Sequence, residues 1–193
     1  ARVLGEMGDS KAVEPLIEVL KHDKNGSVRL YAARALGELG DSKATVHLIE
    51  SLREDRNVDV RVRAARALGR LGGAIVVEPL VEALNDENPQ VCITATDALI
   101  EIGDVATDAL IASLDHEKVN VRCDATRALG EIGNKKAVDK VINMLYDEWV
   151  NVRIYAVTSL GKLNDTKAVP ALIDVMKNRS ENELVRAGDA AAL

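Results

Sequence analysis

Val28-Arg29-Leu30-Tyr31-Ala32-Ala33-Arg34-Ala35-Leu36-Gly37-Glu38-Leu39-Gly40-Asp41 is the stretch that decides the fold, because it recurs along the whole chain. Further copies begin at Val60-Arg61, Val91-Cys92, Val121-Arg122, Val152-Arg153 and Val185-Arg186, at intervals of 30 to 33 residues. A period of this length is typical of a repeat protein. Below, a column is the set of equivalent residues in successive copies, and it carries the residue number of the first copy.

Each copy contains two segments with the spacing of an amphipathic helix. In the first segment, over 12–20, the apolar residues of one face are Val13, Leu16, Ile17 and Leu20. In the second segment they are Val28, Ala32, Ala35, Leu36 and Leu39. Asn25, Asn57 and Asn88 stand just before second segments, where an asparagine can cap a helix. No segment alternates in the manner of a strand, so the sequence predicts an all-α protein.

The repeat predicts one domain over residues 1–193 that is cut within a repeat at both ends. The predicted units are a partial repeat 1–10, full repeats 11–42, 43–73, 74–104, 105–135 and 136–166, and a partial repeat 167–193. Repeat arrays normally carry capping repeats at their ends. We therefore expect a part of a longer chain, whose uncovered end faces promote end-to-end self-association.

Composition and charge exclude several classes of function. Aromatic residues make up 2% of the chain and Phe is absent, which leaves few rings for stacking on bases. The net charge is -6, and residues 74–135 alone carry -8, which argues against nucleic acid as a partner. Cys92 and Cys123 form no CxxC pair, as expected in a reducing, cytoplasmic environment. No apolar run is long enough for a membrane span, so no membrane partner is expected.

The repeated residues resemble the HEAT repeat, and specifically the short HEAT-like repeats of the phycobilisome-lyase type. The matching positions are Ala12 to Leu16, Val28-Arg29, Ala32 to Gly37 and Gly40-Asp41, together with their downstream equivalents. The resemblance covers essentially the whole chain. It implies an α-solenoid of stacked antiparallel helix pairs, with the second helices lining a concave side.

The arginine column is interpreted as structural. The resemblance implies an Asp–Arg ladder that ties successive repeats together, and bidentate pairing between Arg and a carboxylate suits this role. An acid stands six positions before the arginine in three of the copies. The predicted ladder residues are Asp23, Arg29, Asp55, Arg61, Arg122, Asp147 and Arg153. Repeat three has Cys92 in place of the arginine, so an interruption is expected there.

Two groups of residues are candidates for partner binding. Arg63, Arg66 and Arg70 lie outside the core columns at i, i+3 and i+7, and Arg34 shares the column of Arg66. They could form a dock for an acidic segment or a phosphate, or a solvated face balanced by Glu and Asp. In column 31, Tyr31 and Tyr155 stand where other copies have Arg63, Thr94 and Asp124. Trp149 adds a second aromatic near Tyr155, either as an interface anchor or as a cover for the turn beneath it.

No catalytic, cofactor-binding or metal-binding set emerges from the sequence. The three histidines stand in different columns and are expected to share no face. HEAT-type deoxyhypusine hydroxylases use several His-Glu pairs to hold iron, whereas this chain has only His116-Glu117, which disfavours that activity. No cofactor is expected.

The leading hypothesis is a non-enzymatic scaffold that binds another protein or a peptide segment on the concave helical face. The alternative is a subunit of a phycobilin lyase or isomerase complex, as the family resemblance suggests. If the chain is an enzyme, a lyase of this bilin-attachment type is expected. A HEAT-like DNA-binding protein or glycosylase is a third hypothesis, which the acidic middle of the chain opposes.

Overall fold

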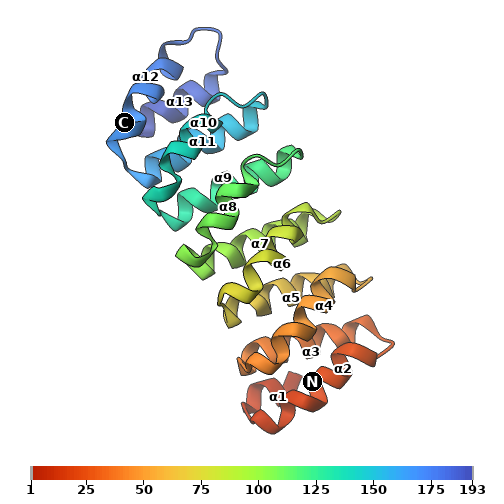
Figure 1. The fold of residues 1–193 in the computed structure, drawn as a ribbon. Coiled ribbons are helices and arrows are strands. Elements are labelled where there is room, and N and C mark those ends of the chain that lie inside the picture. Colours follow the sequence, from red (N-terminus) through yellow and green to blue (C-terminus); the bar gives the residue numbers. More distant parts are fainter. Residues whose placement is uncertain (1, 193) are drawn as a thin grey trace. The chain divides into compact units, whose positions relative to one another are not determined.

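A computed structural model describes residues 2–192 as a succession of helices (Figure 1). The chain divides into two compact units, Ala1–Ile102 and Gly103–Leu193. Residues 1 and 193, at the tips of the two predicted partial repeats, lie outside the described part of the chain. Within residues 2–192 no segment is a strand. The predicted all-α architecture of stacked antiparallel helix pairs is confirmed, whereas the single domain over 1–193 stays a prediction.

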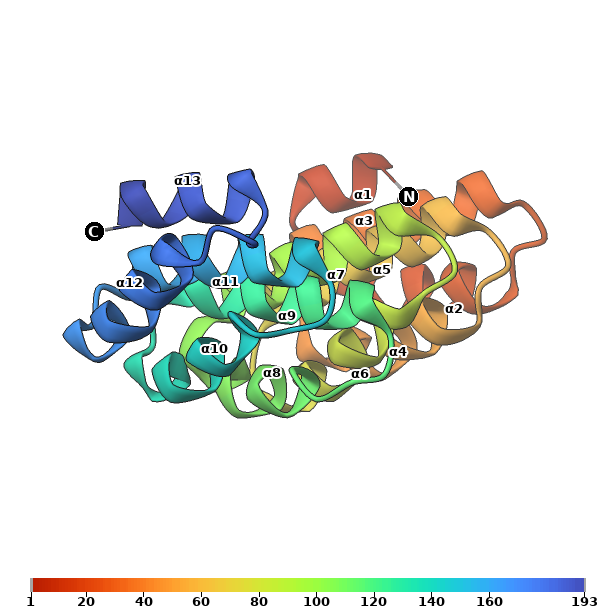
Figure 2. The ribbon, with the colours of Figure 1, turned by 90° about the horizontal axis from the view of Figure 1, so that it is seen from above.

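Unit 1 consists of two layers of helices. The second helices of successive repeats form one layer, in which each helix contacts the next: α1 (Arg2–Met7), α3 (Gly26–Leu39), α5 (Val58–Leu71) and α7 (Pro89–Ile102). The first helices form the other layer: α2 (Val13–His22), α4 (Thr45–Glu54) and α6 (Val77–Glu82). Seen from above, α2, α4 and α6 lie on one side of α3, α5 and α7 (Figure 2).

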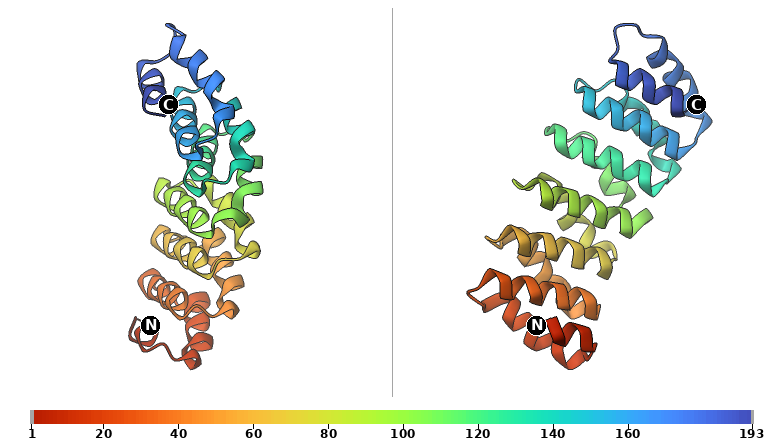
Figure 3. Two further views of the ribbon diagram at one scale, coloured as in Figure 1. Left: turned by 90° about the vertical axis from the view of Figure 1, so that its left-hand side faces the viewer. Right: turned by 180° about the vertical axis from the view of Figure 1, so that it is seen from behind.

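Unit 2 repeats this arrangement. Its second helices are α9 (Val119–Ile132), α11 (Val150–Leu163) and α13 (Glu183–Ala192), and α11 contacts both of the others. Its first helices are α8 (Thr107–Ser113), α10 (Val138–Met144) and α12 (Val169–Lys177). Within each unit the second helices run side by side (Figure 3). Short 3-10 turns lie at Ser10–Ala12, Ser42–Ala44, Ala74–Val76, Ala83–Asn85, Gly103–Ala106, Lys135–Ala137 and Thr166–Ala168.

Small residues let the second helices approach one another closely. Column 32 is alanine in all five full copies, and its members are fully buried. A Cβ atom placed on Gly37 would lie only 2.7 Å from the Cβ atom of Ala67 on the next helix. Leucines such as Leu36 and Leu68 fill the space between the two layers. The regular spacing of the second helices therefore follows from the alanine and glycine columns.

The starts of α9 and α11 in unit 2 differ from those of the other second helices, including α13, where Asn182 accepts from the Leu184 amide at 2.9 Å. In unit 1, Asn25, Asn57 and Asn88 each accept a hydrogen bond from the amide two residues later, at 2.8–2.9 Å. This is the capping interaction expected from the sequence. In unit 2, Lys118 and Trp149 occupy the same position and provide no side-chain cap to α9 and α11. Two helices thus lack a capping interaction that the other repeats possess.

Candidate functional site

The side of the second helices that faces away from the first helices is built from columns 31, 34 and 38, which we call the outer columns. Most of their side chains are at least partly exposed. Thr94 is an exception, because it is 4% exposed and its hydroxyl donates to the Gln90 carbonyl oxygen at 2.8 Å. Each outer column holds at least three different residue types among the five full copies, whereas the core column 36 is leucine in all five.

Three outer-column arginines lie on α5 beside a groove of about 270 Å³ between α3 and α5. Arg63, Arg66 and Arg70 line it together with Arg34, Glu38, Gly37 and Ala67. None of the three forms a hydrogen bond or an ion pair with another of the described residues. The structure therefore brings the predicted arginines together, and the carboxylates described around them do not neutralise them.

The neighbouring helices of unit 1 carry different charges on the same columns. On α3, the Arg34 Nε donates to the Glu38 Oε1 at 2.7 Å, so this arginine is paired within its own helix. Tyr31, one turn earlier, is 44% exposed. On α7, the exposed residues of columns 34 and 38 are Asp97 and Glu101. The outer surface of unit 1 thus changes from basic on α5 to acidic on α7.

In unit 2, aromatic side chains gather around the start of α11. Trp149 is 52% exposed, Tyr146 in the preceding turn is 63% exposed, and Tyr155 on α11 is 38% exposed. The backbone of Trp149 has φ -93° and ψ 124°, close to the values of the capping Asn25 and Asn57. Trp149 therefore stands at a capping position without capping, and about half of its surface remains exposed to solvent.

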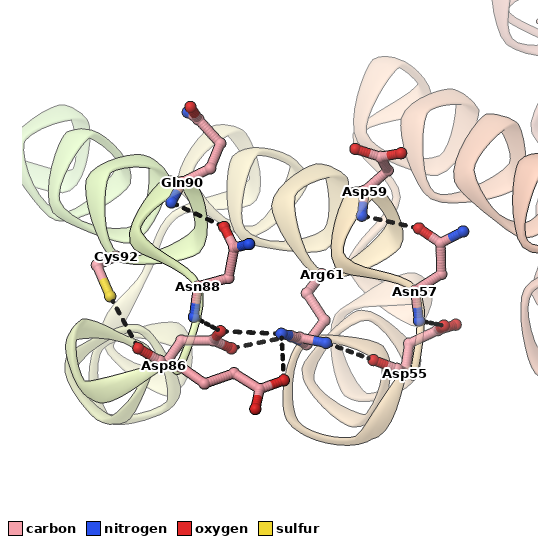
Figure 4. A network of polar contacts seen from close by, with 9 residues as sticks. Asp55, Asn57, Asp59, Arg61, Asp86, Asn88, Gln90 and Cys92 are labelled. Carbon is pink, nitrogen blue, oxygen red and sulfur yellow. Dashed lines mark hydrogen bonds and ion pairs between the residues drawn. The ribbon is translucent and has the colours of Figure 1, made fainter.

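The predicted ladder residues form pairs between consecutive repeats. The Arg61 Nε and Nη2 donate to the two carboxylate oxygens of Asp86, both at 2.9 Å, and Nη1 donates to the Asp55 carbonyl oxygen at 3.0 Å (Figure 4). Arg29 binds Asp55 and Arg122 binds Asp147 in the same bidentate way. Each arginine thus pairs with the acid of the following repeat, 25 or 26 residues ahead.

Three ladder positions depart from this geometry. Asp23 offers its carbonyl oxygen to Arg29, as Asp55 does to Arg61, but among the described residues no arginine of a preceding repeat holds its carboxylate. Cys92, in place of an arginine, donates from Sγ to the Asp86 carbonyl oxygen at 3.3 Å. Arg153 reaches Glu181 through one oxygen at 2.7 Å, which leaves its buried Nε without a partner among the described residues.

Burial and pairing shift the pKa of the ladder carboxylates in opposite directions. Burial raises the pKa of Asp147, but hydrogen bonds from Arg122 and the Trp149 amide, with the charges of Arg122 and Arg153, outweigh it and hold the pKa below its ordinary value. The pKa of Asp55 is lowered by the same balance. A carboxylate whose pKa is lower in the folded than in the unfolded protein stabilises the fold above its unfolded pKa. That stabilisation is lost as the pH falls through the folded value.

We therefore expect the free energy of unfolding to fall steeply between about pH 4 and pH 2, below the ordinary pKa of an aspartate. Asp147→Asn should lower stability at pH 7 and make the decline below pH 4 shallower, because one titrating carboxylate is removed. Urea titrations followed by circular dichroism at a series of pH values measure this. Asp139→Asn, which alters an exposed acid of the same unit, is the control and should keep the wild-type decline. Parallel curves for Asp147→Asn and wild type would contradict the linkage.

The histidines are placed differently from the prediction. His22 and His47 line one hollow of about 400 Å³, although the sequence was expected to keep them apart. Their columns are seven positions apart, which is two helical turns, so neighbouring first helices present them on the same side. Each histidine contacts a glutamate of its own helix: His22 contacts Glu18, and His47 contacts Glu50. The described residues contain no cluster of three or more His, Cys, Asp or Glu able to hold a metal ion.

Two further findings concern the chemistry open to the described chain. Burial raises the pKa of the Cys123 thiol to about 11, and the charges of Asp124 and Asp147 act in the same direction. The thiol is therefore protonated at neutral pH and serves as a small apolar residue. Among the described helices, none has the length and apolar character needed to cross a membrane.

Comparison with known proteins identifies the repeat. The family model described as HEAT repeats matches residues 1–57, 45–118 and 107–193, which together span the chain. The chain belongs to the HEAT-repeat family. No curated protein matches the sequence.

Several solved structures are similar to this HEAT-repeat chain. The complex of CpcE and CpcF of phycocyanin lyase from Nostoc sp. PCC7120 is 26% identical, with a TM-score of 0.54, over 99% of this chain and 86% of that one. An archaeal HEAT-like repeats protein from Thermococcus onnurineus NA1 is 16% identical, with a TM-score of 0.62, over 98% and 89%. Human deoxyhypusine hydroxylase in complex with glycerol is 24% identical, with a TM-score of 0.51, over 98% and 75%. The last two likenesses show the fold alone.

Proposed function

We propose that this HEAT-repeat chain is a non-enzymatic scaffold that holds another protein on the outer columns of its second helices. The observation that carries the proposal is the exposed Trp149 at a capping position. An asparagine there would satisfy a free amide of α11, as Asn25 and Asn57 do in their helices. Trp149 provides no cap and exposes a large apolar ring. Tryptophan and tyrosine are the residues that most often anchor protein interfaces.

The distribution of variation among the repeats supports the same function. Residues that pack the helices are nearly uniform from copy to copy, as in the all-alanine column 32. The outer columns carry Tyr, Arg, Thr, Asp, Glu and Lys at equivalent positions, so the fold does not require any one of them. A surface that varies while its support is constant suits recognition of a partner with its own pattern of charges and apolar groups.

A site-specific crosslinking experiment tests this proposal. A photo-crosslinking amino acid replaces Tyr155 on the outer side of α11 or, as a control, Asp139 on the first helix α10 of the same unit. Both positions are exposed. Irradiation in an extract of the source cells should yield a defined crosslinked protein from position 155 and none from position 139. Equal crosslinking from both positions would place binding elsewhere.

A second candidate function is that of a subunit in a phycobilin lyase or isomerase complex. The likeness to the CpcE and CpcF complex favours it, because it is 26% identical over 99% of this chain. Incubation with a free bilin separates the two candidates. A lyase or isomerase subunit should shift the bilin absorbance spectrum, whereas a scaffold without a chromophore site should leave the spectrum unchanged.

A further inference from the structure

The arginines of α5 form a local excess of positive charge that the fold does not need. Column by column, Arg63, Arg66 and Arg70 correspond to Tyr31, Arg34 and Glu38 on α3 and to Thr94, Asp97 and Glu101 on α7. In unit 2 the same columns read Asp124, Arg127 and Glu131 on α9, and Tyr155, Thr158 and Lys162 on α11. Every other second helix of a full repeat therefore folds with a mixture of residues at these three positions. Only α5 carries arginine at all three.

The three arginines are also unfavourable for the helix that carries them. Arg63 and Arg66 are three residues apart, and Arg66 and Arg70 are four apart, so all three point to one side of α5. Like charges at these spacings destabilise a helix. No described carboxylate pairs with them, because the one acid that lines their groove, Glu38, is held by Arg34. A structural role would be expected to bring a compensating partner, and the described residues supply none.

The groove beside these arginines has room for side chains of another molecule. Gly37 and Ala67 line it, and a Cβ atom on Gly37 would lie only 2.7 Å from the Cβ atom of Ala67, so no side chain of Gly37 can fill the groove. The other lining residues are the three arginines of α5 and the Arg34–Glu38 pair of α3. About 270 Å³ of open space remains between them. The result is a polar groove with three positive charges in excess.

The spacing of the arginines indicates the shape of the bound group. Along a helix, positions i and i+7 are about 10 Å apart. One carboxylate cannot contact side chains over that length, whereas alternate residues of an extended peptide lie about 7 Å apart on the same side. Two or three acidic residues at alternate positions would therefore meet all three guanidinium groups. The planar guanidinium binds a carboxylate through two parallel hydrogen bonds.

We propose that the α5 groove binds an extended acidic segment of a partner protein, in which glutamate or aspartate occurs at alternate positions. The proposal rests on the scaffold function argued above and specifies the chemistry of the partner. The acidic residue Glu101 on α7 gives the segment a direction, because this exposed carboxylate repels a continued run of carboxylates. The acidic run should therefore end, and basic residues should follow, where the partner passes from α5 to α7.

Binding of two labelled model peptides to the whole chain tests the proposal. The first peptide alternates glutamate with glycine over seven residues, and the second has glutamine in place of every glutamate. Fluorescence anisotropy at low ionic strength should show binding of the glutamate peptide alone. Replacing Arg63, Arg66 and Arg70 together by glutamine should weaken binding about 10- to 100-fold, since each exposed pair contributes a factor of about two to five.

A charge-matched variant separates the groove from the overall charge of the protein. Lys11→Gln, Lys21→Gln and Lys24→Gln together remove three exposed positive charges from the same unit, outside the groove. This variant should bind the glutamate peptide within about twofold of wild type. Equal weakening in both triple variants, or equal binding of the two peptides by wild type, would overturn the proposal. Tighter binding of a single-stranded oligonucleotide that the groove variant loses would also overturn it, in favour of a nucleic acid.

These outcomes are distinct from a failure of the scaffold function. Absence of crosslinking at position 155 refutes binding on the outer columns of unit 2, whatever the model peptides do. Loss of the difference between the two triple variants refutes the acidic segment on α5 and leaves crosslinking at position 155 unaffected. The two measurements concern different units of the chain, so each result can be assigned to one proposal.

Discussion

Arg61→Ala should lower the free energy of unfolding by about 3–5 kcal/mol at pH 7, the cost typical of removing one partner from a buried ion pair. The Arg61 side chain is 7% exposed and that of Asp86 is 12% exposed. Removing the guanidinium leaves the Asp86 carboxylate with little access to water and without its two charged hydrogen bonds. It also removes the donor to the Asp55 carbonyl oxygen within repeat two, and with the Asp86 pair it removes a link between repeats two and three.

The chain contains a matched control for this prediction. Arg53 pairs with Glu82 through Nε and Nη2, at 2.8 and 3.0 Å, and joins the same two repeats on their other layer. The two side chains of this pair are about half exposed, Arg53 at 47% and Glu82 at 50%. Exposed ion pairs contribute little because water and salt screen them. Arg53→Ala should therefore leave the urea midpoint nearly unchanged, and a loss equal to that of Arg61→Ala would show that burial does not decide the strength of the ladder.

The fold was predictable from the sequence because it depends on residues that recur. About every 31 residues the sequence repeats the alanine columns, the leucine column 36 and the glycines that follow the second helices. The same helical pattern is therefore seen several times, which makes its interpretation firm. The ladder follows for the same reason, since Arg61 and Asp86 belong to columns that recur together. Even so, the column pattern alone did not show that Asp23 would contribute its carbonyl oxygen rather than its carboxylate to Arg29.

The candidate site was less predictable because it depends on residues that differ from copy to copy. Column patterns cannot decide whether nearby acids balance the charges of the arginines on α5. That outcome depends on the side-chain conformation of Glu38, which turns to Arg34. Thr94 is buried and its hydroxyl donates to the backbone of its own helix, although the other members of its column are at least partly exposed. His22 and His47 line one hollow because neighbouring first helices lie side by side, a relation that the sequence of a single helix does not reveal.

Trp149→Asn should raise stability and weaken partner binding at once. Asparagine at a helix N-cap is worth about 1 kcal/mol relative to a residue that cannot cap. The backbone at position 149 already has the conformation of Asn25 and Asn57, so no rearrangement opposes the gain. Truncating an aromatic anchor at the centre of an interface typically costs 2 kcal/mol or more, equivalent to about a 30-fold rise in Kd. Stability is measured by urea unfolding, and affinity is measured for the partner identified by crosslinking at position 155.

Lys118→Asn separates these two effects, because Lys118 occupies the capping position of α9 with φ -81° and ψ 125° and likewise provides no cap. It should give a similar gain in stability without altering affinity. A structural role for Trp149, as a cover for the turn beneath it, predicts instead that Trp149→Asn destabilises unit 2 while Lys118→Asn does not. Loss of stability in Trp149→Asn with unchanged affinity would therefore refute the role of Trp149 as an interface anchor, on which the scaffold function rests. Gains in stability in both variants, with weaker binding only in Trp149→Asn, would show that the tryptophan is kept for its partner at the expense of the helix.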